Sequence, residues 1–195
     1  PANSVDSVNL TSFLASFENS SADLALNNGL KIVSDELISA LYEVRASSNK
    51  EFVSLKGGKA LGTDFYTPFP TNWATGTTTP SSFSSIEIVA TENGTVVLIT
   101  PRTDVTGSHP ANVSYTVALA AGQTYSARDA NASAATSLAG SIVSSNKPIA
   151  LTVYSGATSE SGTLSTMMDQ LTNSTYAGKD FVIRKGKGNN ERIYI

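Results

Sequence analysis

The sequence has no cysteine and only one histidine, His109. Disulfides, thiol catalysis and haem attachment through cysteine are therefore excluded, and a zinc site built from Cys and His cannot form. Charged residues make up 15% of the chain and the net charge is −3, which does not suit nucleic acid, whose phosphates need a basic face. No apolar run approaches the roughly 18 residues of a membrane-spanning helix.

Uncharged hydroxyls supply the polarity that charged residues do not. The 195 residues include 28 Ser and 22 Thr, and the 40% of apolar residues is enough for a hydrophobic core. The chain begins with Pro1 rather than Met, so we expect a mature or trimmed product. We expect residues 1–195 to form one β-sandwich domain or two closely packed repeats, about 1–139 and 140–195, the second incomplete.

Short strand-like runs separated by turns fill the chain. Ile86, Ile88 and Ala90 alternate with intervening residues, the period-two pattern of a strand with one buried face. Asn93-Gly94 then precedes a second run at 96–100, and Asn-Gly between two such runs predicts a type I′ hairpin. Further strand candidates are 30–34, 38–45, 52–55, 64–69, 113–119, 124–127, 149–154, 181–184 and 192–195.

The spacing of these runs, about 8–12 residues, is typical of all-β sandwiches and barrels. Residues 35–45 carry apolar side chains at helical spacing, but β-branched and aromatic neighbours favour a strand there. Residues 165–171 could form one helical turn. The sequence thus predicts an all-β fold, an antiparallel, jelly-roll-like β-sandwich.

A weak internal repeat has an offset of about 110 residues. Residues 32–34 recur at 142–144, and 61–65 resemble 177–181. The second pair of segments aligns Gly62 with Gly178 and Asp64 with Asp180. We expect these four residues to form turns, in which Gly adopts an unusual backbone conformation and Asp caps a backbone amide.

Patterns typical of catalytic and metal-binding sites are absent from the sequence. His109 has Ser108 beside it in sequence, which does not provide triad geometry, and no Gly-x-Ser-x-Gly elbow is present. The 16 acidic residues are scattered, and no Asp-x-Asp-x-Asp calcium loop occurs. The sequence therefore predicts no catalytic residue, no metal site and no cofactor.

Two groups of surface residues are candidates for modification or binding. Tyr66 and Trp73 lie near a Thr-rich loop, and exposed aromatic residues on a β-scaffold commonly hold proteins or sugars. The alternative is that Trp73 covers one end of the sandwich. Six Asn-x-Ser/Thr sequons are glycan acceptors if the host glycosylates secreted proteins, and ordinary polar turns otherwise. They are Asn9, Asn19, Asn93, Asn112, Asn131 and Asn173.

An ordered set of segments resembles the IgGFc-binding protein N-terminal-like family of secreted and surface proteins. The segments are IVSDELISAL (32–41), KALGTDFY (59–66), SIEIVATENGTVVLI (85–99), LAAGQTY (119–125), GSIVSSNKPIALTVYSG (140–156) and MDQL to YAGKDF (168–181). The resemblance implies an extracellular or cell-surface β-domain without catalysis. The cysteines of animal members are absent, so we do not expect cysteine-dependent assembly or antibody-fragment binding to carry over.

The resemblance favours a non-enzymatic binding or adhesion module with an extracellular protein or glycan as its ligand. The alternative is a structural subunit of an extracellular filament or sheath, forming homo-oligomers through terminal strands. In that case a terminal segment such as Pro1–Phe17 would pair with an open sheet edge of the next subunit. A hydrolase of surface glycans is the least favoured hypothesis, because the sequence contains no catalytic motif.

Overall fold

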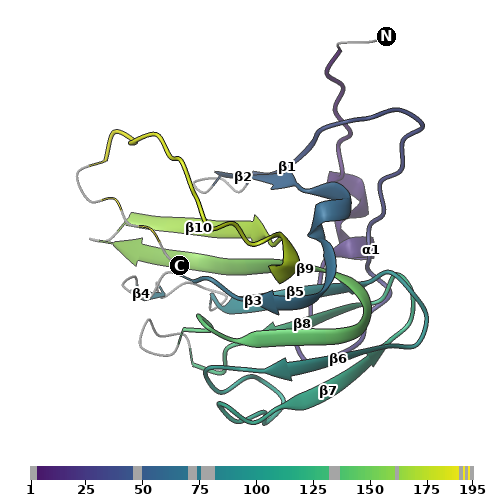
Figure 1. Cartoon of the computed structure of the whole chain (residues 1–195), viewed down its shortest axis with the longest axis vertical. Coiled ribbons are helices and arrows are strands. Elements are labelled where there is room, and N and C mark those ends of the chain that lie inside the picture. The colour runs from purple at the N-terminus through teal and green to yellow at the C-terminus, as the bar shows by residue number, and fades with distance from the viewer. Residues whose placement is uncertain are drawn as a thin grey trace.

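Antiparallel strands are the predominant regular secondary structure of the computed structural model, which describes residues 4–45, 50–69, 74–75, 82–131, 137–160, 163–188, 191 and 193 (Figure 1). The strands are β1 (Ala40–Arg45), β2 (Lys50–Leu55), β3 (Leu61–Tyr66), β4 (Ala74–Thr75), β5 (Ser84–Ala90), β6 (Thr95–Thr100), β7 (Tyr115–Leu119), β8 (Thr124–Arg128), β9 (Ile142–Glu160) and β10 (Thr163–Gln170). The helical turns are η1 (Thr11–Phe13), α1 (Leu14–Phe17), η2 (Gly57–Ala60) and η4 (Ser174–Tyr176). The predicted all-β class is confirmed.

Strand β9 organises an eight-stranded sheet. The hydrogen-bonded order is β7-β6-β9-β5-β8, and β3, β4 and β10 also pair with β9. Residues 142–145 of β9 pair with β6, whereas residues 149–155 pair with β5. Because β3 pairs with β9 along both stretches, β5 and β6 both lie along the opposite edge of β9. The expected sandwich is therefore one curled sheet, and β1 and β2 form a separate antiparallel pair.

The predicted hairpin at Asn93-Gly94 is wrong, although a turn is present there. β5 pairs with β8 and β9, and β6 pairs with β7 and β9, so the two strands are not hydrogen-bonded to each other. Gly94 has a positive φ of 70° but Asn93 does not, whereas a type I′ turn needs positive φ at both. The turn instead connects strands that pair with successive stretches of β9.

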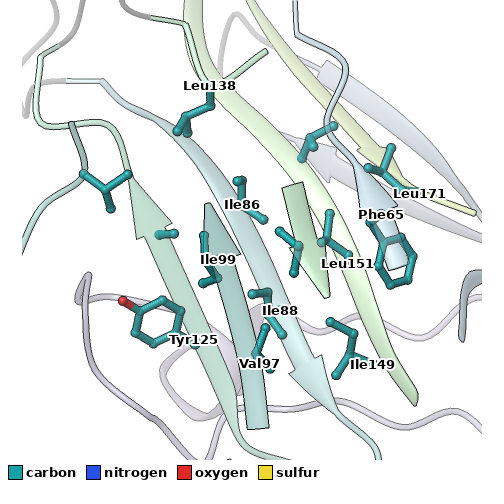
Figure 2. Close-up of a cluster of buried hydrophobic side chains, with 14 of the residues drawn as sticks. Phe65, Ile86, Ile88, Val97, Ile99, Tyr125, Leu138, Ile149, Leu151 and Leu171 are labelled. Carbon is teal, nitrogen blue, oxygen red and sulfur yellow. The ribbon is translucent and has the colours of Figure 1, made fainter. Parts of the chain in front are cut away.

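One hydrophobic cluster lies inside the curl. Ile86 and Ile88 of β5 are buried together with Val97 and Ile99 of β6 and with Leu151 of β9 (Figure 2). In β6 the buried residues alternate with exposed ones, as expected for a strand with one face on the core. The same cluster includes residues from β3, β7 and β8.

The N-terminal segment covers the outer edge of β8. Backbone amides of Asp23, Leu26 and Gly29 donate to the carbonyl oxygens of Ser126, Thr124 and Gly122 over 3.1, 3.0 and 3.0 Å. This segment therefore satisfies polar groups that an edge strand would otherwise expose. Residues 11–17 form helical turns, so this part of the predicted N-terminal strand Pro1–Phe17 is wrong.

Several strand predictions also fail for a shared reason. Residues 30–34 and 181–184 have strand-like sequences but lie outside the strands, while 165–171, predicted as a helical turn, falls largely in β10. A strand forms only where a neighbouring strand supplies hydrogen bonds and packing. The last candidate, 192–195, lies outside the described residues except for Ile193, which is not in a strand.

The internal repeat is not confirmed. Residues 142–144 and 61–65 lie in strands β9 and β3, whereas their sequence counterparts at 32–34 and 177–181 lie in no strand or helix. Whether the chain forms one domain or two packed repeats stays a prediction.

Candidate functional site

Outward side chains of four neighbouring strands form an exposed surface that we call the open face. The register places Leu98 of β6 beside Thr116 of β7 on one side and Ser144 of β9 on the other. Ser144 also pairs with Asp64 of β3. Directly paired residues lie on the same side of a sheet. The open face consists of Asp64, Tyr66, Val96, Leu98, Thr116, Ala118, Ile142 and Ser144.

The open face carries large exposed apolar side chains and little charge. Val96, Leu98 and Ile142 are 43%, 41% and 44% exposed, and Tyr66 is 65% exposed. Asp64 is the one Asp, Glu, Lys, Arg or His among its eight residues. Depletion of charge together with an exposed tyrosine is typical of the central part of protein–protein interfaces. Because the strands fix the backbone, a partner would immobilise few flexible groups on binding.

Of the two predicted binding aromatics, the structure places Tyr66 on the open face. It pairs with Ile142 of β9 at the end of β3. Its role in binding stays a prediction. Trp73 lies outside the described residues.

The six predicted glycan acceptors fall into two groups. Asn9, Asn93, Asn112 and Asn131 are exposed. The side chain of Asn19 is engaged, because its Nδ2 donates to Glu87 over 2.6 Å and its Oδ1 accepts from the Thr124 hydroxyl over 2.5 Å. Asn173 is buried, and its side chain accepts from the backbone amide of Thr175. Whether any of the six carries a glycan stays a prediction.

The turn predicted around Gly62 and Asp64 is wrong. Both residues lie in strand β3, and Gly62 does not have a positive φ. Gly62 is needed for space instead, because a Cβ atom added to it would lie 2.2 Å from Cγ of Asn173. Gly178 and Asp180 are exposed and lie outside the strands, so the four residues are not structural equivalents.

His109 joins a polar cluster with Asp23, Tyr115 and Tyr125. His109 Nε2 lies 2.9 Å from Asp23 Oδ1, and the hydroxyl of Tyr125 donates to the same oxygen over 2.6 Å. The imidazole ring stacks on Tyr115 with a centroid distance of 3.6 Å. Sequence analysis missed this cluster because Asp23 is 86 positions from His109 and no local motif links them.

Burial and hydrogen bonding shift the pKa values in this cluster in different directions. Burial acts to raise the pKa of Asp23, but hydrogen bonds from Tyr125 and His109 outweigh it and leave that pKa lowered. Burial raises the pKa of Tyr115 to about 12. The cluster therefore holds a carboxylate against two neutral phenols at neutral pH, and it fixes the N-terminal segment to β7 and β8.

A shallow pocket of about 410 Å³ lies where the N-terminal segment passes the ends of β5 and β8. Its lining includes Phe83, Thr106, Arg128 and Asp129. The guanidinium carbon of Arg128 lies 4.0 Å from the centroid of the Phe83 ring, and Arg128 also donates to the backbone oxygen of Asn19. Burial raises the pKa of Asp129 to about 6, although a hydrogen bond from the Ser84 amide acts in the opposite direction.

Clusters of metal ligands and membrane-spanning helices are both absent from the described part of the chain. It contains no group of three or more His, Asp or Glu side chains placed to hold a metal ion. None of its helices has the length and apolar character needed to cross a membrane.

The family comparison covers every strand of the curled sheet. A family model described as IgGFc binding protein matches residues 51–195, which begin within β2 and include β3 to β10 and the whole open face. The chain belongs to the IgGFc-binding protein family. Neither a curated protein nor a solved structure matches it. The resemblance seen in the sequence is confirmed, and the IgGFc-binding family is one of binding domains that are typically extracellular.

Proposed function

We propose that this protein is a non-enzymatic binding and adhesion module of an extracellular or cell-surface protein, and that the open face contacts a protein ligand. The observation that carries the proposal is the run of exposed Tyr66, Ile142, Leu98 and Val96 across three strands that bury their other faces. Family membership supports the binding role.

The shape of the site favours a protein over a small molecule or a single sugar. Small ligands are bound in concave sites that enclose most of their surface. The open face is instead the outer side of four strands, and protein interfaces are often broad surfaces with tyrosine near their centre. A glycan ligand remains the alternative to be tested against it.

The test measures binding of the intact chain to immobilised extracellular proteins, with immunoglobulin Fc fragments, fibronectin, collagen and mucin as probes, and to a glycan array. We expect binding to at least one protein, weakened about tenfold or more in Tyr66→Ala and Leu98→Asp, since truncation of a central interface residue removes about 1–2 kcal/mol or more.

The matched control is Phe181→Ala, which removes an aromatic side chain that is 77% exposed, against 65% for Tyr66, and that lies outside the four strands of the open face. This variant should bind as the unaltered protein does. An equal loss of binding affinity in Phe181→Ala and Tyr66→Ala, or binding of the chain to glycans alone, would contradict the proposal.

A further inference from the structure

The two outermost strands of the path β7-β6-β9-β5-β8 differ in what is hydrogen-bonded to their outer edges. The outer edge of β8 exchanges backbone hydrogen bonds with the N-terminal segment at Leu26. In the described residues, the backbone of β7 is hydrogen-bonded to β6 alone. β7 lies at the lower border of the molecule in Figure 1, with no strand beyond it.

The sequence of β7 lacks the features that normally protect an edge strand. Residues 113–121 (VSYTVALAA) contain no charged residue, no proline and no glycine. The pairing of β7 with β6 runs without a register shift, so no bulge turns the edge away. Soluble proteins usually block such an edge with lysine, proline or a bulge, because its free amides and carbonyls can pair with another strand.

We propose that two copies of this chain pair through their β7 strands, antiparallel and around a twofold axis at Val117. This arrangement places Tyr115 opposite Leu119 of the second copy, and Thr116 opposite Ala118. The outward-facing members of these pairs, Thr116 and Ala118, are small and uncharged, so they do not clash or repel across the axis. A twofold interface requires a surface that is complementary to itself. The β7 edge meets this requirement, because small uncharged side chains face each other across the axis.

The charges near the two ends of β7 are compatible with antiparallel self-pairing. Before the strand, Arg102 donates to Asn112 over 2.8 Å and Asp104 accepts from the backbone of Ala111 over 2.8 Å. After the strand, Glu92 lies 3.7 Å from Lys147, next to Asn93, which accepts from the Ala121 amide. Arg102 and Asp104 at one end, and Lys147 and Glu92 at the other, give each end both a cation and an anion. The first end also holds Asp23, which is paired with His109 beside Tyr115. Antiparallel pairing therefore does not bring together two ends that carry a single sign of charge.

The arrangement joins the two open faces into one surface. Val96 and Leu98 of β6 pair with Ala118 and Thr116 of β7, so the apolar rows of both copies would run across the shared edge. A bivalent surface of this kind raises the avidity for a repetitive partner without any new contact. The pairing itself is independent of which ligand the open face binds.

The experiment compares three proteins by light scattering after size exclusion over a range of concentrations. The unaltered chain should form a dimer of twice its 20.3 kDa mass. Thr116→Lys with Ala118→Lys places lysine directly opposite lysine twice, and it should raise the dimer dissociation constant about tenfold or more, since like charges opposite each other destabilise strand pairs.

The matched control is Thr116→Lys with Ala118→Glu, which substitutes the same two positions. It places lysine opposite glutamate in the same register, so it should dimerise more tightly than the double lysine variant. Circular dichroism spectra and melting temperatures confirm that all three proteins fold. A monomeric unaltered chain, or equal dissociation constants for the two double variants, would overturn the proposal. If the chain is a monomer, the β7 edge would instead be available to pair with an extended segment of another protein.

Discussion

At the scale of single residues, two aspartate side chains differ in their burial. Asp64 is exposed on β3, whereas Asp129 is 7% exposed and accepts a hydrogen bond from the Ser84 amide. Burial raises the pKa of Asp129 to about 6 from 3.8. A buried carboxylate of this kind destabilises the fold when it is ionised, because the charge loses hydration.

The pKa of Asp129 leads to a prediction about pH. Well above pH 6 the Asp129 carboxyl is ionised in both the folded and the unfolded state, and only in the folded state does its charge lose hydration. The contribution of Asp129 to the free energy of unfolding should therefore become more favourable as the pH falls through 6 toward 3.8. Asp129→Asn keeps an acceptor for the Ser84 amide and should stabilise the protein at pH 7.5 by up to about 3 kcal/mol.

Urea denaturation at two pH values checks this prediction. The difference in free energy of unfolding between Asp129→Asn and the unaltered chain should shrink by more than half at pH 4.5. If the variant and the unaltered chain differ in free energy of unfolding by the same amount at pH 7.5 and pH 4.5, the carboxylate charge is not the cause of that difference.

The contact between Gly62 and Asn173 leads to a second prediction. Gly62→Ala adds a Cβ atom 2.2 Å from Cγ of Asn173, so one of the two segments must shift. We expect a loss of about 1–3 kcal/mol in the free energy of unfolding, as for other overpacked sites.

The matched control is Gly58→Ala, because an added Cβ there meets nothing within 4 Å. Thermal melts of both variants should show a lower melting temperature for Gly62→Ala alone. Equal melting temperatures would mean that Asn173 moves aside without loss.

At the scale of elements, the turn at 91–94 determines how β5 and β6 are placed. Thr95 donates its hydroxyl proton to the backbone oxygen of Glu92 over 2.7 Å, and Lys147 Nζ lies 2.7 Å from the backbone oxygen of Asn93. The first contact closes the turn, and the second attaches it to the part of β9 where pairing changes from β6 to β5. The turn therefore stabilises the curl rather than a hairpin.

The positive φ of Gly94 provides a test of this turn. At φ 70° a β-branched residue is strained, so Gly94→Val should destabilise the protein by about 1–2 kcal/mol. Gly94→Asn should lose less, because asparagine tolerates the left-handed region. Denaturation midpoints of the two variants measure the difference, and a valine variant as stable as the asparagine variant would contradict the geometry.

At the scale of the whole molecule, the two sheets differ in burial. The curled sheet encloses the hydrophobic cluster, whereas the β1–β2 pair buries Val53 but leaves Leu41 and Phe52 exposed. Its attachment to the larger sheet includes the ion pair of Lys56, the residue after β2, with Asp169 at 2.8 Å, and an exposed ion pair adds little stability. The two sheets should therefore open independently.

Hydrogen exchange tests this difference directly. Amides in the central strands β5 and β9 should exchange slowest, with protection approaching that of global unfolding, and amides of β1 and β2 should exchange much faster through local opening. Equal protection in β2 and β5 would show that the two sheets unfold as one unit.

The sequence by itself determined the class of the fold and the positions of most strands. Alternation at 86–90 and the turn residues after it are local signals, because side chains alternate along a strand whatever its neighbour. The same local order of motifs was sufficient to recognise the family. The absence of cysteine alone excludes disulfide and thiol chemistry, because no fold can supply a thiol group that the chain does not contain.

Only the tertiary structure decided which strands pair and which surface stays open. Asn93-Gly94 predicts a hairpin locally, but β9, about 50 residues farther along the chain, supplies the hydrogen bonds to both β5 and β6. Asp23 lies close to His109 because the N-terminal segment is hydrogen-bonded to β8, far away in the sequence. Residues 30–34 and 181–184 have strand-like sequences without a partner strand. The partner of a strand, unlike its side-chain alternation, is set by distant residues and by the burial that they share.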